Sequence, residues 1–205
     1  MKLAKTNLQG FKNLVSLTIL LTTHIILAQE NNTSEPLITD RPDATEASSA
    51  VGKGVLQIET GSFYESFEED YIKSETFTYN TTLIRYGLLD NLELRVGWDF
   101  TEGKTKINGN TLNNVTSGFS PLLLGVKVDI AEENGLMPEI ALIGHVFPLF
   151  TASTDYRPES TAIDFRFSMS HTLSEKSSLG YNLGSEWKDD SHEAAGVYTL
   201  AYGYS

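Results

Sequence analysis

The chain has 205 residues, of which 40% are hydrophobic and 20% are charged, and its mean hydropathy is −0.19. This composition is too polar for a bundle of membrane-spanning helices, whereas an outer-membrane barrel tolerates it because half of each strand faces a polar interior. The absence of cysteine excludes a disulfide framework and a thiolate metal site. The formal net charge of −12 argues against a nucleic-acid partner, which requires a basic face.

Residues 1–28 have the pattern of a secretory signal peptide. Three lysines precede an apolar run from Leu14 to Leu27, and Ala28 is a small residue at the end of a cleavage site. The run is short for a spanning helix, which needs about 20 apolar residues. We therefore expect a signal peptide rather than an uncleaved anchor, and export to the outer membrane of a Gram-negative bacterium.

Residues 29–53 are polar and aperiodic, and we expect them to form an N-terminal periplasmic segment. Charge is concentrated around Pro42. One interpretation is a solvated linker. The other is a segment that docks on the inner side of a barrel, with Arg41 paired to acids there. The docking candidates are Asp40, Arg41 and Asp43.

From Gly54 onward the sequence alternates with a period of two. The clearest case is Leu83–Phe100, where Asp90-Asn91 predicts a tight turn between two strands. After that turn, Leu92, Leu94, Val96, Trp98 and Phe100 share one parity, whereas Glu93, Arg95, Gly97 and Asp99 share the other. Because side chains alternate across a strand, this hairpin has one apolar face and one charged face.

The same alternation predicts about eight strands and no helix after residue 28. In the fifth strand both parities are apolar, so its facing stays open. The expected strands are Gly54–Ser66, Thr76–Leu88, Leu92–Phe100, Leu122–Ile130, Leu136–Phe147, Ile163–Ser170, Leu179–Trp187 and Val197–Tyr204.

The predicted connections alternate between short and long. Those at Asp90, Asn134 and Glu175 are tight, whereas those at Glu68–Lys73, Thr101–Thr116, Pro148–Glu159 and Lys188–Glu193 are longer and more polar. This is the layout of an up-and-down outer-membrane barrel with periplasmic turns and external loops. We therefore expect an all-β, antiparallel transmembrane β-barrel over residues 54–205. It is either a small closed barrel or a larger one truncated at its C-terminus.

The polar parity carries more charge than a packed core could hold, because each charge costs several kcal/mol to bury unless it is paired. We expect these side chains to face the lumen; the simpler interpretation of each is a ladder of paired charges across neighbouring strands. A secreted β-sandwich with the charged parity in solvent is the alternative fold. The lumen-facing candidates are Arg85, Glu93, Arg95, Asp99, Lys127, Asp129, Asp164, Arg166 and Glu186.

Five stretches resemble a known family in their order and spacing: Ile38–Glu46, Gly54–Gly61, Leu83–Arg95, Ser120–Lys127 and Leu179–Gly184. They are similar to the transporter-like outer-membrane barrels grouped with the phenol-degradation meta-pathway proteins. The resemblance runs from Ile38 to the end of the chain. It implies an outer-membrane barrel that passes small hydrophobic or aromatic compounds, and it supplies no catalytic residues.

Three functions remain open from the sequence. The first is a passive channel or transporter for small solutes, in which the loops Thr101–Thr116 and Pro148–Glu159 fold in to restrict passage. The second is a structural or adhesive barrel without transport. The third is an outer-membrane hydrolase, which would need a Ser–His–acid arrangement around His145, His171 or His192.

No nucleophile motif is present, so we expect no enzyme activity, catalytic residue, metal or cofactor. The expected partners are outer-membrane lipid, the outer-membrane assembly machinery and a small-molecule solute. The sequence leaves the oligomeric state open.

Overall fold

A computed structural model describes residues 37–40, 44–112, 115–188 and 193–204. The chain divides into two compact units, 1–37 and 38–205. The predicted signal peptide lies outside the described residues. No helix in the described part of the chain is long and apolar enough to cross a membrane.

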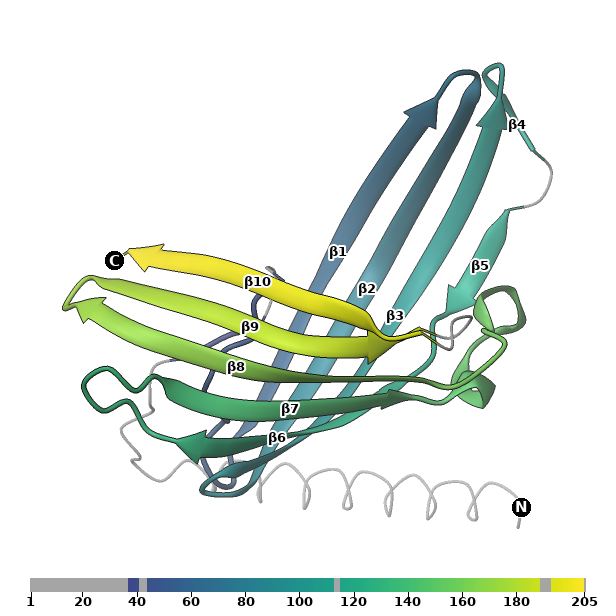
Figure 1. The fold of residues 1–205 in the computed structure, drawn as a ribbon. Coiled ribbons are helices and arrows are strands. Elements are labelled where there is room, and N and C mark those ends of the chain that lie inside the picture. The colour runs from purple at the N-terminus through teal and green to yellow at the C-terminus, as the bar shows by residue number, and fades with distance from the viewer. Residues whose placement is uncertain (1–36, 41–43, 113–114, 189–192, 205) are drawn as a thin grey trace, which may run out of the picture. The chain divides into compact units, whose positions relative to one another are not determined.

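The unit 38–205 is one antiparallel β-sheet with two short 3-10 turns (Figure 1). Its main path joins β1, β2, β3, β6, β7, β8, β9 and β10 in that order, and the short strands β4 and β5 pair with β3. The elements are β1 (Leu56–Glu69), β2 (Ile72–Leu89), β3 (Leu92–Ile107), β4 (Asn110–Thr111), β5 (Thr116–Phe119), β6 (Leu123–Ala131), β7 (Glu139–Phe147), η1 (Leu149–Thr151), η2 (Thr154–Tyr156), β8 (Ala162–Ser174), β9 (Ser177–Trp187) and β10 (Ala195–Tyr204).

The predicted all-β, antiparallel, up-and-down fold is confirmed, with eight strands on the main path. The sheet curls into a half-barrel in which β1 and β10 are the two ends of the strand order (Figure 1). The turn at Asp90-Asn91 lies between β2 and β3, and Glu175-Lys176 lies between β8 and β9, both as predicted.

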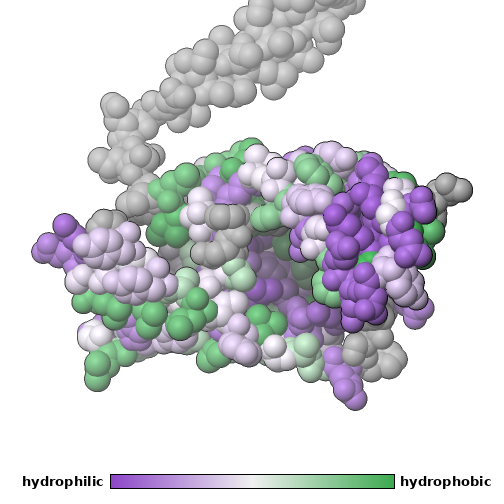
Figure 2. All heavy atoms as spheres, turned by 90° about the horizontal axis from the view of Figure 1, so that it is seen from above, coloured by the Kyte–Doolittle hydropathy of each residue, from purple (hydrophilic) through white to green (hydrophobic). Residues whose placement is uncertain are grey.

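The two faces of the sheet have an inverted distribution of polarity. On β3, Glu93 and Arg95 are 0% and 2% exposed, whereas Leu94 and Val96 are 39% and 37% exposed. We call the face that carries Arg95 the inner face and the opposite one the outer face. Figure 2 shows hydrophilic residues inside the hollow of the curled sheet. This burial is the opposite of what a β-sandwich with its apolar parity in a core requires.

The structure decides the facing of β7, which the sequence left open. Ala141 and Ile143 are fully buried, and they pair with Asp129 and Lys127 of β6 on the inner face. The strand begins at Glu139 rather than at the predicted Leu136, which is 98% exposed in the preceding connection.

Two of the predicted long loops are wrong. β1 and β2 run on to Glu69 and Ile72, so the connection predicted at Glu68–Lys73 is a two-residue turn at Asp70-Tyr71. Likewise β3 continues to Ile107 and turns at Asn108-Gly109, both with positive φ, as a tight primed hairpin turn requires. In these segments polar residues lie on both faces of the strand. The composition therefore resembles that of a loop, and the sequence pattern did not predict the strands.

The connection Pro148–Glu159 is a loop, as predicted, and it packs against β5. Its Ser153 N–H donates to the carbonyl of Phe119 over 3.0 Å, and Phe119 N–H donates to Ser153 Oγ over 2.8 Å. The loop thereby covers the outer edge of β5. The predicted loop Lys188–Glu193 falls largely outside the described residues.

Candidate functional site

Two arginines lie directly opposite each other on the inner face. Arg85 of β2 pairs with Arg95 of β3, and both are almost fully buried. Like charges in this position repel, so carboxylates must lie nearby. Glu93 supplies one of them: Arg85 Nε and Nη2 donate to Glu93 Oε1 and Oε2 over 2.8 and 2.9 Å. This is the two-pronged geometry in which a guanidinium binds a carboxylate most strongly.

A second carboxylate reaches Arg85 from β1. Arg85 Nη1 donates to Glu59 Oε1 over 3.1 Å, and Gln57 Nε2 donates to the same oxygen over 2.7 Å. Gln57 and Glu59 are each 8% exposed. Neighbouring strands therefore supply carboxylates on both sides of Arg85.

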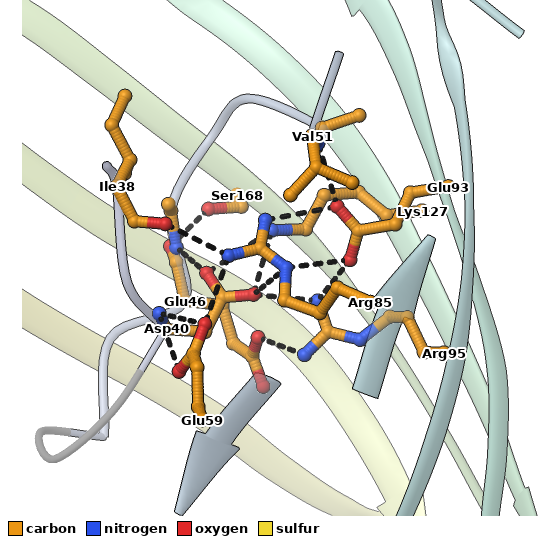
Figure 3. Close-up of polar contacts among 12 residues, drawn as sticks. Ile38, Asp40, Glu46, Val51, Glu59, Arg85, Glu93, Arg95, Lys127 and Ser168 are labelled. Atoms are coloured by element: carbon orange, nitrogen blue, oxygen red, sulfur yellow. Dashed lines mark hydrogen bonds and ion pairs between the residues drawn. The ribbon is translucent and has the colours of Figure 1, made fainter. Parts of the chain in front are cut away.

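A third carboxylate comes from outside the sheet. Asp40 precedes the strands, yet its Oδ2 lies 2.7 Å from Arg95 Nη1, 3.0 Å from Lys127 Nζ and 3.3 Å from Arg85 Nε (Figure 3). Its Oδ1 accepts from the Ala47 N–H over 2.8 Å. Three cations from three different strands thus converge on one carboxylate that is only 3% exposed.

The surroundings of Asp40 act on its pKa in opposite directions. Burial by itself would raise the pKa, because it disfavours the charged form. Lys127, Arg95 and Arg85 together outweigh burial and hold the pKa of Asp40 well below its ordinary value of 3.8. The carboxylate is therefore ionised at any physiological pH.

The residues around Asp40 form a segment whose main chain is held by side chains of the sheet. We call Ile38–Asp40 and Ala44–Lys53 the docked segment. Arg85 Nη1 donates to the Ile38 carbonyl over 2.9 Å, Val51 N–H donates to Glu93 Oε2 over 2.9 Å, and Ala50 N–H donates to Asp129 Oδ1 over 3.0 Å. Inner-face charges thereby satisfy backbone groups that have no strand partner.

Glu46 connects the two sides of the curled sheet. Its Oε2 lies 2.6 Å from Arg95 Nη2 on β3. Its backbone N–H donates to Asn182 Oδ1 on β9 over 2.7 Å, and its carbonyl accepts from Asn182 Nδ2 over 2.9 Å. The same carbonyl accepts from Ser168 Oγ on β8 (Figure 3). The docked segment therefore spans the hollow from β3 to β9.

The docked segment packs closely against the sheet at Gly87. Gly54 N–H donates to the Gly87 carbonyl over 2.8 Å, and Lys53 bridges Gly87 in parallel. A Cβ on Gly87 would lie 2.1 Å from the Gly52 carbonyl oxygen. Only glycine allows the segment to approach β2 this closely.

In the described part of the chain, ion pairs join four carboxylates and three cations in one network, which is buried apart from the partly exposed Glu46. They are Asp40, Glu46, Glu59 and Glu93 facing Arg85, Arg95 and Lys127. Buried ions are tolerated only when paired, and removing one partner typically costs about 3–5 kcal/mol. We call the three cations the cation cradle.

A second polar group lies further along the inner face. His145 Nδ1 lies 2.8 Å from Asp164 Oδ1, and Arg166 Nη2 lies 3.4 Å from Asp164 Oδ2. His145 packs against Gly125, where a Cβ would come within 2.3 Å of its ring. His145 Nε2 is buried and has no hydrogen-bond partner in the described part of the chain.

Seven of the nine lumen-facing candidates fall into three sets, and Glu186 and Asp99 lie outside them. Arg85, Glu93, Arg95 and Lys127 form the buried network; Asp164 and Arg166 belong to the His145 group; Asp129 holds the docked segment. Glu186 is half-buried and pairs with Lys188 over 3.2 Å. Asp99 is half-buried on β3. Their role in a lumen stays a prediction.

Of the docking candidates, the structure places Asp40 at the centre of the network, whereas Arg41 and Asp43 lie outside the described residues. Of the histidines, His171 Nε2 lies 3.4 Å from the Tyr181 hydroxyl, and His192 lies outside the described residues. Among the described residues no three His, Asp or Glu side chains gather as a metal site would require.

Sequence reasoning missed several members of the network. Glu59 lies on the same polar parity as the candidates and could have been included on that ground. Glu46 has no such signal, because it lies in an aperiodic segment. Asn182 and Ser168 are neutral residues that donate to the Glu46 carbonyl. They reach it only because the sheet curls and brings β8 and β9 to the segment.

Residues 39–205 match the model of a protein family described as "Putative MetA-pathway of phenol degradation". The match begins within the docked segment and covers the whole sheet. A search of curated proteins found no match.

Proposed function

The chain belongs to this phenol-degradation family, and on that premise we propose that it is an outer-membrane β-barrel acting as a passive channel or transporter for small compounds. The observation that carries the proposal is the inverted polarity of the curled sheet, apolar outside and charged inside. The family's description makes small hydrophobic or aromatic compounds the expected solutes.

The outer face supports lipid as its solvent. Leu56, Leu94, Val126, Phe167 and Leu200 come from five different strands and are 39–72% exposed. Soluble monomers rarely expose apolar patches beyond a few hundred Å². β7 and β9 have 9 and 11 residues, the length with which a tilted strand crosses a bilayer.

The inner face supports an aqueous or solute-filled interior. Its charges are held in place by ion pairs and by the docked segment rather than by bulk water. In hydrocarbon every backbone polar group must form a hydrogen bond. The proposal therefore requires that the edge strands β1 and β10, at the two ends of the strand order, be paired in the membrane.

A structural barrel without transport is the second candidate. It is favoured by the docked segment, which lies across the inner face and links β3 to β9 through Glu46. A hollow filled in this way would pass solute only if the segment moved.

The membrane part is tested by two matched substitutions. Leu94→Arg places a charge on the outer face, where we expect a loss of about 2–4 kcal/mol of folding free energy in lipid vesicles. Leu136→Arg, in a fully exposed connection, should cost almost nothing. Equal costs for the two variants would contradict a lipid-facing outer surface.

The transport part is tested in planar bilayers and proteoliposomes. We expect conductance steps above the protein-free control and faster entry of phenol into vesicles. Folded protein, recognised by heat-dependent migration on a detergent gel, that gave neither conductance nor flux would overturn transport and leave the structural barrel.

A further inference from the structure

The cation cradle is built by the sheet, but the anion that fills it comes from elsewhere in the chain. Arg85, Arg95 and Lys127 belong to β2, β3 and β6, whereas Asp40 belongs to the docked segment. In the described part of the chain, the hydrogen bonds of Lys127 Nζ go to that segment: to the Asp40 carboxylate at 3.0 Å and to the Ser49 carbonyl at 3.4 Å. The segment therefore supplies the carboxylate that lies within ion-pair distance of this cation.

The pairing of the charges leads to the same conclusion. Among the described residues, Glu59 and Glu93 of the sheet form ion pairs with Arg85 and Arg95, whereas Lys127 forms its ion pair with Asp40 of the segment. A buried cation whose paired carboxylate is removed is unfavourable and attracts an anion.

The geometry specifies the kind of anion. Among the groups of the sheet, Arg95, Lys127 and Arg85 face Asp40 Oδ2, and Lys127 also faces Oδ1. Both oxygens of a planar carboxylate are thus engaged at 2.7–3.3 Å. A small carboxylate reproduces this arrangement, whereas a neutral phenol does not.

We propose that the cation cradle is a carboxylate-binding site occupied in this structure by Asp40, and that a small organic carboxylate competes with Asp40 and releases the docked segment from the inner face. As Asp40 is only 3% exposed, the competitor binds the minor state in which the segment has lifted. Its apparent affinity is therefore reduced by the fraction of molecules in that state. That the release opens a path for solute rests on the proposed function; the binding does not.

The first experiment empties the site. Asp40→Ala removes the carboxylate and leaves space, whereas Asp40→Asn keeps the shape with a neutral amide. In detergent micelles we expect acetate to raise the urea midpoint of Asp40→Ala in a saturable manner, as a ligand of the folded state does. Asp40→Asn should not respond, and chloride at equal ionic strength should not replace acetate. An effect of acetate no larger than that of chloride would overturn the carboxylate site.

The second experiment follows release without touching Asp40. The chain has no cysteine, so Val51→Cys, buried in the docked segment, and Leu136→Cys, fully exposed, each give one labelling position. We expect acetate to raise the maleimide labelling rate of Val51→Cys several-fold over chloride and to leave Leu136→Cys unchanged. An unchanged rate for Val51→Cys would overturn release, and this arm decides if Asp40→Ala does not fold.

Neither experiment uses a bilayer or solute flux. A negative result in either leaves the channel proposal standing, and a silent bilayer leaves the carboxylate site standing.

Discussion

The β2–β3 hairpin carries two charged regions of similar composition and opposite character. Near the Asp90-Asn91 turn, Arg85, Glu93 and Arg95 are buried beneath the docked segment. Toward the far end, Glu75 pairs with Lys73 and Lys106 over 3.2 and 2.6 Å, and these side chains are partly exposed. Figure 1 shows these distal ends of β2 and β3 extending beyond β6 to β10.

The difference teaches that alternation sets the face of a charge but not its energetic role. In both regions the charged side chains follow the alternation of a β-strand. Only the region near the Asp90-Asn91 turn is covered by the docked segment. Solvated ion pairs contribute little to stability, whereas in the covered network each ion depends on its partners. The hypothesis of paired charges across strands holds for both regions, with different consequences.

The largest expected effect comes from breaking the covered network. Arg95→Met removes the cation shared by Asp40, Glu46 and Glu93, and the stranded carboxylates should cost about 3–5 kcal/mol of the free energy of unfolding. Lys104→Met, in the partly exposed region, is the control and should leave urea unfolding unchanged. Comparable losses of the free energy of unfolding in the two variants would show that burial under the docked segment does not make the charges more important for stability.

The next effect concerns the close approach of the docked segment to the sheet. Gly87→Ala should push the Gly52 carbonyl away and cost about 1–3 kcal/mol, as overpacking does. Gly144→Ala is the matched control, because the nearest atom to its Cβ would lie 4.0 Å away. Urea unfolding of both variants measures the difference, and a silent Gly87→Ala would argue that the segment is not tightly seated.

A smaller effect is expected from acid. The pKa of Asp40 in the folded protein lies below its ordinary value of 3.8, so the unfolded chain takes up the proton first as pH falls. The stabilisation is therefore complete above that ordinary value and is lost progressively below it. Asp40→Asn should be less stable at neutral pH and should lack this part of the acid loss.

Urea midpoints for wild type and Asp40→Asn across a pH series give the difference between the two curves. Other carboxylates titrate in both proteins and cancel in that difference. Parallel curves would show that Asp40 is not held ionised by the cradle.

The smallest effect separates the two regions most directly. Glu75→Gln should lower the urea midpoint only slightly, because its ion pairs are partly exposed. Glu93→Gln, fully buried between the two arginines, should lower it clearly. A cost for Glu75→Gln that matched Glu93→Gln would overturn the distinction drawn between the regions.

Local pattern was sufficient for much of the fold. The turn residues at Asp90-Asn91 and Glu175-Lys176 and the alternation around them predicted the hairpins correctly. The pattern misled where polar residues lie on both faces, as at Glu68–Lys73 and Thr101–Thr116, because composition there cannot separate a solvated strand from a loop. It left β7 open because both of its faces are apolar.

For the site, the sequence by itself determined which charges share a face, because the period of two is a property of the backbone. Only the tertiary structure decided that Asp40 would meet Lys127 and that Glu46 would meet Asn182, 87 and 136 positions apart. Those contacts exist because the sheet curls and a segment without periodicity crosses its hollow. The burial that makes these charges interdependent follows from that crossing, and no single strand encodes it.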